Sequence, residues 1–134
     1  MSHYQDIDTC MKDEKALIRA LARVGYNTVE LHAEAQNLYG YQGDKREQKA
    51  EVIIRRAYVG SSSNDIGYVK GPDGNFKALI SDYDSNKHNT EWQNKVSTYY
   101  NIEKAKMTYE NKRMKYTETV DDKGRVQLKA RLHV

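Results

Sequence analysis

The strongest constraint on how this chain folds is a pair of apolar segments joined by one tight turn, in residues 65–82. The turn reads Gly71-Pro72-Asp73-Gly74 and contains the only proline of the 134 residues. Proline presets the backbone of the second residue of a turn, Asp tolerates the third position, and Gly suits a residue whose φ is often positive. We therefore predict two adjacent strands on either side of this turn.

Size and composition predict a single domain, residues 1–134, with a modest core. A chain of this length fits one domain and buries about two thirds of its unfolded surface. Hydrophobic residues make up 38% and charged residues 31%, against about 45–50% apolar residues in a typical domain. There are eleven Tyr but one Phe and one Trp. Tyrosine suits half-exposed positions, so we interpret most of these rings as the outer layer that covers a thin core. The alternative is that they form a partner surface.

The sequence carries no sign of export or of membrane insertion. Cys10 is the single cysteine, which excludes an internal disulfide framework and fits a reducing compartment. No apolar run approaches the ~18 residues that span a bilayer, and the first ten residues lack the cationic and apolar regions of a secretion signal. We expect a soluble, cytoplasmic protein without a membrane partner.

Two segments have the periodicity of amphipathic helices. The first follows Asp13, a helix-capping residue, and ends at Gly25, which suits a left-handed terminal residue. The second spans residues 90–113, as one bent helix or two short ones, and opens with a predicted capping box from Thr90 to Gln93. Their apolar stripes are Ala16, Leu17, Ala20, Leu21 and Val24 in the first, and Trp92, Val96, Tyr99 and Ile102 in the second.

The remaining apolar segments predict strands. Besides the two around the turn, we place them at residues 3–8, 26–31, 50–58, 116–120 and 126–134. Residues 125–134 alternate strictly between polar and apolar, as in a half-buried strand with a basic outer face, and Asp121-Asp122-Lys123-Gly124 turns into it. The polar residues 37–48, with two glycines, read as a loop, and residues 60–64 as a hairpin connection.

Together these elements predict an α+β fold. We expect one antiparallel or mixed β-sheet with an N-terminal helix and a longer C-terminal helical segment packed on one face, ending in a C-terminal β-hairpin.

Several short motifs along nearly the whole chain resemble one family, the domain of unknown function 1257, or hypothetical chloroplast reading frame 35, of cyanobacteria and algal plastids. The motifs are Met1-Ser2-His3-Tyr4, Ala20-Leu21 to Gly25, Tyr39-Gly40-Tyr41-Gln42-Gly43, Asp65-Ile66-Gly67-Tyr68, Leu79-Ile80-Ser81-Asp82, Gln93 to Tyr99-Tyr100, and Gly124-Arg125-Val126-Gln127-Leu128 to Arg131. The resemblance implies a conserved accessory protein without assigned chemistry, and the plastid stroma as its compartment if the gene is organelle-encoded. This chain departs from the family at Tyr83-Asp84-Ser85 and at Leu132-His133-Val134, where it has less apolar bulk.

Positive charge is concentrated at the carboxyl end. From Lys104 onward there are nine Lys or Arg and four Asp or Glu, which gives +5, whereas residues 1–103 carry −2. We predict a macromolecule-binding face there, together with the polar loop around Tyr39 and Tyr41. Its residues are Lys104, Lys106, Lys112, Arg113, Lys115, Arg125, Lys129 and Arg131, with Tyr109 and Tyr116 able to stack on unpaired bases.

Signals for catalysis or metal binding are weaker. His3, Cys10, His32 and His88 have none of the spacings that place two ligands on one metal. No His is paired locally with Cys10 in the sequence, and the Ser61-Ser62-Ser63 run has loop composition, not the strained turn that exposes a nucleophile. Gly40 and Gly43 before Lys45-Arg46 imitate a phosphate-binding loop without its pattern. The carboxylates Asp65, Asp82 and Asp84 bracket the hairpin, and the last two share a face if the strand extends that far.

The leading hypothesis is therefore a non-enzymatic accessory or adaptor protein that binds another macromolecule through the basic carboxyl-terminal face. We expect the partner to be another protein, and no cofactor or metal. The alternatives are a module that binds RNA or single-stranded DNA, and a small metal-dependent enzyme that uses the hairpin carboxylates.

Overall fold

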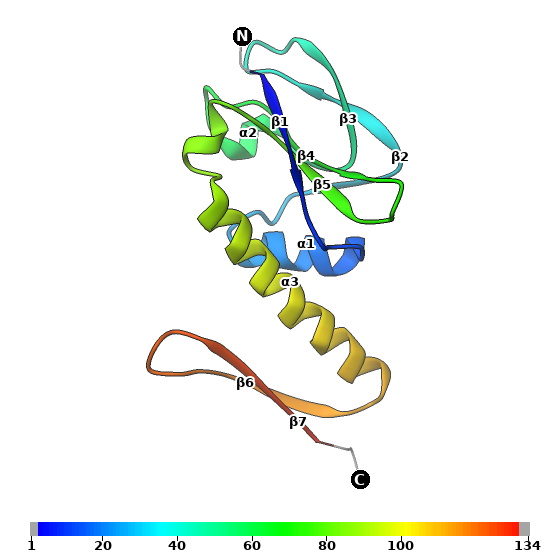
Figure 1. The fold of residues 1–134 in the computed structure, drawn as a ribbon, viewed down its shortest axis with the longest axis vertical. Helices are drawn as coiled ribbons and strands as arrows, with labels where there is room; N and C mark the ends of the chain where they lie inside the picture. The colour runs from blue at the N-terminus through cyan, green and yellow to red at the C-terminus, as the bar shows by residue number, and fades with distance from the viewer. Residues whose placement is uncertain (1–2, 132–134) are drawn as a thin grey trace.

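The structure is a computed structural model that describes residues 3–131. It contains a five-stranded antiparallel sheet, two main helices and a separate two-stranded hairpin at the carboxyl end (Figure 1). In chain order the elements are β1 (Tyr4–Asp8), α1 (Glu14–Arg23), β2 (Glu30–Tyr39), β3 (Lys45–Ile54), α2 (Arg56–Val59), β4 (Ile66–Lys70), β5 (Phe76–Ser81), η1 (Asp84–Asn86), α3 (Thr90–Asn111), β6 (Lys115–Val120) and β7 (Val126–Arg131). The predicted α+β class is confirmed, and the sheet is antiparallel in the order β1-β5-β4-β3-β2.

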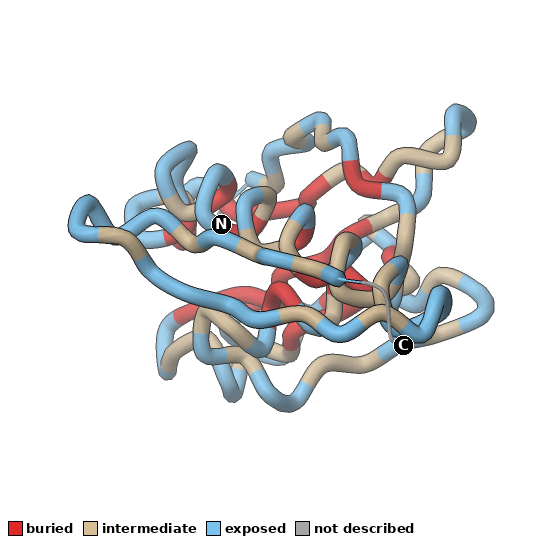
Figure 2. Tube along the Cα trace, turned by 90° about the horizontal axis from the view of Figure 1, so that it is seen from below, coloured by how far each residue is buried: buried red, intermediate tan, exposed pale blue. Residues whose placement is uncertain are grey.

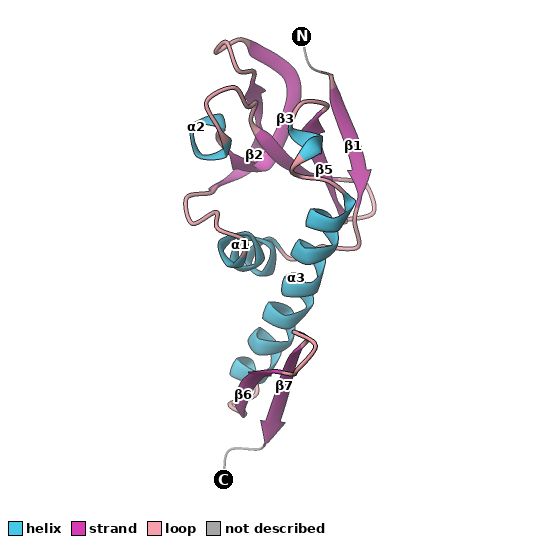
Figure 3. Cartoon of the chain, turned by 90° about the vertical axis from the view of Figure 1, so that its left-hand side faces the viewer, coloured by secondary structure: helices cyan, strands magenta, loops and turns pink. Residues whose placement is uncertain are grey.

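Both α1 and α3 lie on the same side of the sheet (Figure 3). Because side chains alternate between the faces of a strand, every second residue of β3, β4 and β5 points toward these helices. The fully buried side chains of this layer include Leu17 and Leu21 of α1, Ile54, Tyr68, Phe76 and Ile80 of the sheet, and Val96 of α3. Figure 2 shows the buried stretches gathered in the middle of the molecule, while the described part of β6–β7 is only intermediate or exposed.

The helix boundaries follow the predicted local chemistry in α1 and depart from it in α3. Asp13 caps α1 by accepting hydrogen bonds from the backbone of residues 15 and 16, and Gly25 has a φ of 104°. The segment 90–111 forms one continuous helix, whose capping residue is Asn89 and not Thr90. The predicted capping box is therefore wrong. The side chain of Gln93 does not cap the helix but is buried, and its Oε1 accepts a hydrogen bond from the Tyr68 hydroxyl at 3.3 Å.

The predicted loop at residues 37–48 is wrong: β2 and β3 form a long hairpin, and only residues 40–44 turn between them. Strand pairing uses backbone groups, which polar side chains on an exposed edge do not prevent. β2 is an edge strand and begins only at Glu30, and β3 ends at Ile54, where the predicted strand 50–58 gives way to the short helix α2. Residues 60–64 connect α2 to β4. Together with α2 they join β3 to its antiparallel neighbour β4.

The β2–β3 hairpin covers part of the second face of the sheet. Its register shifts between Leu31 and Gln36 and again before Tyr39, and such irregularities bend a hairpin. Leu38, Ala50, Ile53 and Leu79 form a small buried cluster on that face. Gly67 of β4 lies directly beneath it, because a Cβ there would be 2.8 Å from the Ala50 Cβ and 3.0 Å from a Leu38 methyl.

The β6–β7 hairpin is attached to the body through α3 and a set of ion pairs. An isolated two-stranded hairpin is at best marginally stable in water. Glu118 of β6 accepts hydrogen bonds from Arg23 of α1, at 2.6 and 3.1 Å, and pairs with Lys106 of α3 at 2.5 Å. Glu103, only 7% exposed, bonds the same arginine at 3.1 Å. Residues 132–134, which belong to the predicted last strand, lie outside the described residues.

We predict that Gly67→Ala destabilises the protein by about 1–3 kcal/mol, the range for overpacking a well-filled site. The added methyl group meets the side chains of Leu38 and Ala50, so the hairpin must move away from the sheet. Urea unfolding followed by circular dichroism measures the change. Gly43→Ala is not a matched control because Gly43 has a φ of 79°. A stability of Gly67→Ala equal to that of the wild type would show that the hairpin does not press on β4.

We also predict that the hairpin loosens from α3 at acidic pH. The hydrogen bonds from Arg23 and then from Lys106 lower the pKa of Glu118. A carboxylate with a lowered pKa stabilises the folded state above its unfolded pKa, about 4.3, and this contribution is lost as pH falls through the folded pKa. NMR chemical shifts of the β6 and β7 amides should therefore change below about pH 4.

Glu118→Gln should bring those shifts at pH 7 toward the acidic spectrum of the wild type. Glu110→Gln is the matched control, since Glu110 pairs with Arg19 and does not contact the hairpin through an ion pair. Equal spectra of Glu118→Gln and wild type at neutral pH would contradict this account of the attachment.

Candidate functional site

The register of β6 and β7 divides their side chains between two faces. Directly opposed residues of an antiparallel pair share a face. One face holds the pairs Tyr116–Ala130, Glu118–Leu128 and Val120–Val126, and its glutamate bonds α1 and α3. The other, which we call the outward face, consists of Lys115, Thr117, Thr119, Gln127, Lys129 and Arg131, all exposed.

The outward face has three cations and no acidic residue. Lys115 stands directly opposite Arg131, and Lys129 opposite Thr117. Like charges in directly opposed positions of a sheet are destabilising. No carboxylate within the described residues forms an ion pair with any of the three, so the hairpin itself does not compensate this repulsion.

The remaining cations predicted for the site divide into two groups. Lys104 pairs with Asp13 at 2.8 Å, Lys106 with Glu118, and Arg125 with Asp121 at 2.7 Å, so their charges are already balanced. The other group is exposed at the end of α3 and has no ion pair to the described residues. It consists of Lys112 and Arg113. With Lys115, Lys129 and Arg131 these two make up what we call the basic end.

Tyr109 and Tyr116, predicted to be available for base stacking, contact each other instead. Their ring centroids are 6.1 Å apart with an interplanar angle of 40°, and the ammonium of Lys106 lies 5.9 Å from the centre of the Tyr116 ring. Both residues are only partly exposed. A nucleic-acid base would have to displace one of these contacts to stack on either ring.

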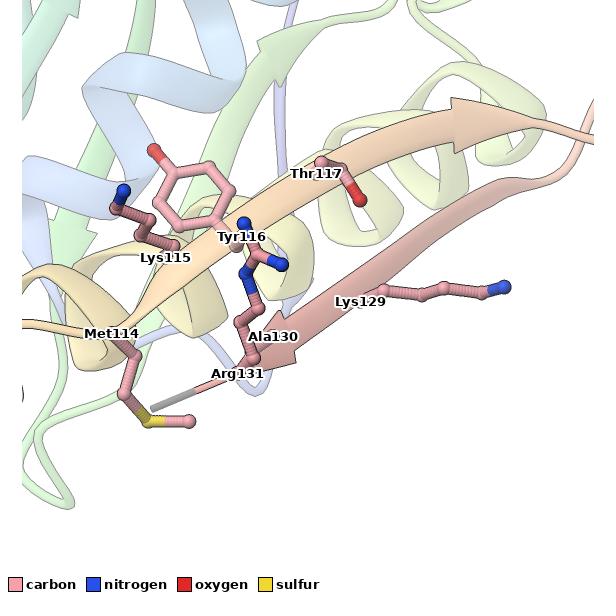
Figure 4. A pocket seen from close by; sticks show the side chains of 7 residues that line it. All are labelled: Met114, Lys115, Tyr116, Thr117, Lys129, Ala130 and Arg131. Atoms are coloured by element: carbon pink, nitrogen blue, oxygen red, sulfur yellow. The ribbon is translucent and has the colours of Figure 1, made fainter. Parts of the chain in front are cut away.

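A shallow cavity of about 470 Å³ lies at the open end of the hairpin (Figure 4). Its lining combines the methionine that precedes β6 with charged and apolar residues of both strands. In Figure 4 the side chain of Lys129 points away from the other sticks, and that of Arg131 reaches across toward β6. The lining residues are Met114, Lys115, Tyr116, Thr117, Lys129, Ala130 and Arg131.

Tyr39 and Tyr41 do not belong to this surface. They lie at the β2–β3 turn, near the amino-terminal end of the molecule, whereas the hairpin lies at the opposite end (Figure 1). They are 38% and 41% exposed. The two parts of the predicted contact surface are therefore separate.

The three hairpin carboxylates have different surroundings and do not converge. Asp65, 1% exposed, accepts hydrogen bonds from the backbone of Tyr39 and Arg56 and from the Arg55 guanidinium. Asp82 is exposed and accepts from the Gln5 amide at 2.7 Å. Because β5 ends at Ser81, the condition under which Asp82 and Asp84 would share a strand face is not met, and Asp84 lies buried in η1.

The predicted metal ligands are dispersed as well. His3 and Cys10 are exposed, and His32 bonds Glu30 at 2.7 Å. His88 is 4% exposed and its Nε2 lies 2.6 Å from the Tyr26 hydroxyl. Within residues 3–131, no group of three or more His, Cys, Asp or Glu side chains is placed to hold a metal ion.

The loop that imitates a phosphate-binding site is an ordinary hairpin turn. The Gly40 amide donates to the Asp44 carbonyl at 2.8 Å, and the Gly43 amide donates to the Gly40 carbonyl at 2.9 Å. These N–H groups are thus occupied within the turn. Among the helices of the described chain, none is both long and apolar enough to cross a bilayer.

A group of buried polar residues was not predicted from the sequence. Asn64, Ser81, Asp84 and His88 are at most 4% exposed, and the first three bond one another between the α2–β4 connection and η1. The only sequence signal was the Ser-rich run 61–63, which by composition reads as a flexible connection.

Comparison with known families identifies one match. The model of the family described as "Protein of unknown function (DUF1257)" matches residues 20–128. This range runs from the middle of α1 into β7 and contains Gly67 and most of the β6–β7 hairpin. No curated protein and no solved structure was found to match. Because the family match covers most of the chain, the resemblance carried by its motifs is confirmed, and the protein belongs to the DUF1257 family.

Proposed function

We propose that this protein is a non-enzymatic accessory protein that binds an acidic surface of another protein through its basic end. The observation that carries the proposal is the outward face, where three cations lie among neutral polar residues without an ion pair to the described chain. Of the hairpin acids, Glu118 and Asp121 are already paired with other cations. Complementary charge on a partner would relieve the repulsion between Lys115 and Arg131 and would steer the encounter.

A second candidate is binding to RNA or single-stranded DNA by the same surface. The five cations of the basic end, which form no ion pair with the described residues, can neutralise several phosphates and give a salt-sensitive affinity. Single-strand binding also relies on aromatic rings that are open to bases, whereas Tyr109 and Tyr116 pack against each other. This difference favours a protein partner.

The third hypothesis, a metal-dependent enzyme built on the hairpin carboxylates, has the least geometric support. Asp65 and Asp84 are buried and hydrogen-bonded to different backbone segments, and Asp82 faces solvent. Two carboxylates that hold one metal must approach within a few ångströms of it.

We predict that Lys129→Glu combined with Arg131→Glu abolishes partner capture without unfolding the domain. Both side chains are exposed and form no ion pair with the described residues, and the double reversal changes the charge of the outward face by −4. Tagged protein purified from native cells, with and without nuclease, and analysed by mass spectrometry measures the bound partners.

The matched control is Lys45→Glu combined with Lys49→Glu, an equal charge change on exposed residues of β3 at the other end of the molecule. Partners retained by the control and lost by the hairpin variant support the proposal. An unchanged partner set in the hairpin variant would exclude this face. Partners that disappear with nuclease would transfer the function to the nucleic-acid candidate.

A further inference from the structure

A second cavity, of about 370 Å³, lies near the end of the molecule opposite the hairpin. It opens between the connection from α2 to β4 and the segment around η1, and residues 59–63, 83, 84 and 86–88 supply its lining. Ser63, Asp84 and His88 in that lining are 6%, 4% and 4% exposed. None of them contributes to the basic end.

Asp84, which lines this cavity, has one carboxylate oxygen without a hydrogen bond to the described residues. Its Oδ2 accepts hydrogen bonds from the Asn64 backbone and the Ser81 hydroxyl, both at 2.9 Å. Its Oδ1 accepts none from the described residues. Oδ1 is not among the described side-chain atoms that are both buried and unpaired, so it is accessible to solvent, and Asp84 is one of the residues that line the cavity.

The negative charge of Asp84 has no counter-charge in the described chain. No Lys or Arg of residues 3–131 forms an ion pair with it, although Lys87 lines the same cavity. A carboxylate removed from bulk water without a counter-ion is unfavourable. Burial, as the largest cause, and then the charge of Asp84 raise the pKa of the nearby Tyr26 hydroxyl.

His88 does not supply the missing positive charge. Its Nδ1 lies 3.2 Å from the Asp84 carbonyl and its Nε2 lies 2.6 Å from the Tyr26 hydroxyl, so both ring nitrogens are occupied. Burial, as the largest cause, lowers the pKa of His88. The imidazole is therefore neutral at pH 7, and its edge-on contact with Trp92, with centroids 4.6 Å apart, holds it in place.

Ser63 adds a second polar group to the cavity. Its backbone N–H donates to the Gly60 carbonyl at 3.1 Å, while its hydroxyl forms no hydrogen bond with the described residues. That hydroxyl is also absent from the buried unpaired atoms, so it too is accessible to solvent, and Ser63 lines the cavity. Tyr83, 52% exposed, contributes an aromatic ring to the lining.

We propose that this cavity binds an ammonium group, with Asp84 Oδ1 as its counter-ion and Ser63 Oγ as a second acceptor. A single open carboxylate oxygen suits the point charge of an ammonium better than the two-pronged guanidinium. One carboxylate oxygen and one hydroxyl are too few ligands for a Ca²⁺ ion, which takes six to eight. The ring of Tyr83 can add a cation–π contact.

The ammonium can belong to a free small amine or to a lysine side chain of another protein. The probes are n-butylammonium chloride, its neutral analogue n-butanol, and Nα-acetyl-lysine methylamide, each titrated into ¹⁵N-labelled protein at constant ionic strength. We expect n-butylammonium to cause saturable amide shifts in residues 61–63 and 84–88, and n-butanol to cause none. If Nα-acetyl-lysine methylamide also binds, the ligands of the cavity include lysine side chains of other proteins. If it does not bind, the ligand is a free small amine.

Three variants test the assigned groups. Asp84→Asn should weaken n-butylammonium binding about tenfold or more, the loss of one charged hydrogen bond, and Ser63→Ala should weaken it less. Lys87→Gln removes a like charge from the cavity lining and should strengthen binding by up to about fivefold. Lys123→Gln, an equal change in the exposed β6–β7 turn, should have no effect.

Absence of saturable binding to the wild type, or equal binding of n-butanol, would overturn the proposal. So would an affinity that Asp84→Asn leaves unchanged. If Asp84→Asn does not fold, judged by the amide spectrum of the sheet, the other two variants decide. Binding that neither Ser63→Ala nor Lys87→Gln alters would then overturn it.

Discussion

The arrangement of the sheet depends on one buried carboxylate, that of Asp65. Its oxygens accept hydrogen bonds at 2.7 Å from the backbone of Tyr39, where β2 ends, and of Arg56, where α2 begins. The Arg55 guanidinium pairs with the same carboxylate at 2.8 Å. The Asp65 carbonyl accepts from the Tyr4 hydroxyl of β1 at 2.7 Å. A single residue thus joins four elements, and the bonds to its carboxylate are charged hydrogen bonds, which are stronger than neutral ones.

This junction determines how the second face of the sheet is covered. Because the end of β2 is bound to the start of β4, the bent β2–β3 hairpin lies over Gly67, and Leu38 reaches the small apolar cluster. Asn64, the residue before the junction, extends it to Asp84 and so positions the second cavity. At the opposite end of the molecule, Arg23 and Lys106 bond both the buried Glu103 and Glu118 of β6. There the β6–β7 hairpin is attached through partly exposed ion pairs, which salt and acid weaken.

The sequence predicted those features that depend on neighbouring residues. Helix α1, its Asp13 cap and the turn at residues 71–74 are determined locally, as is the β6–β7 turn. The β2–β3 pairing was not predictable in this way, because its polar residues on an edge are compatible with loop and strand alike, and only the distant Asp65 contact selects the strand. Summed charge identified the carboxyl end but not its ion pairs: Lys104, Lys106 and Arg125 meet carboxylates that periodicity could not place.

Helix α3 sets the distance between the two proposed contacts. It begins just after His88, which lines the second cavity, and ends at Asn111, next to the basic end. Its 22 residues, at about 1.5 Å each, give roughly 33 Å of continuous helix. The first half of α3 is buried against the sheet through Val96 and Tyr100, which makes it a rigid spacer on that side. Two ligands at its ends would therefore not collide, and the distance exceeds the Debye length of about 8 Å at physiological salt. Charge at the basic end should accordingly leave an ammonium beside Asp84 unaffected, so any coupling between the ends would have to pass through α3 itself.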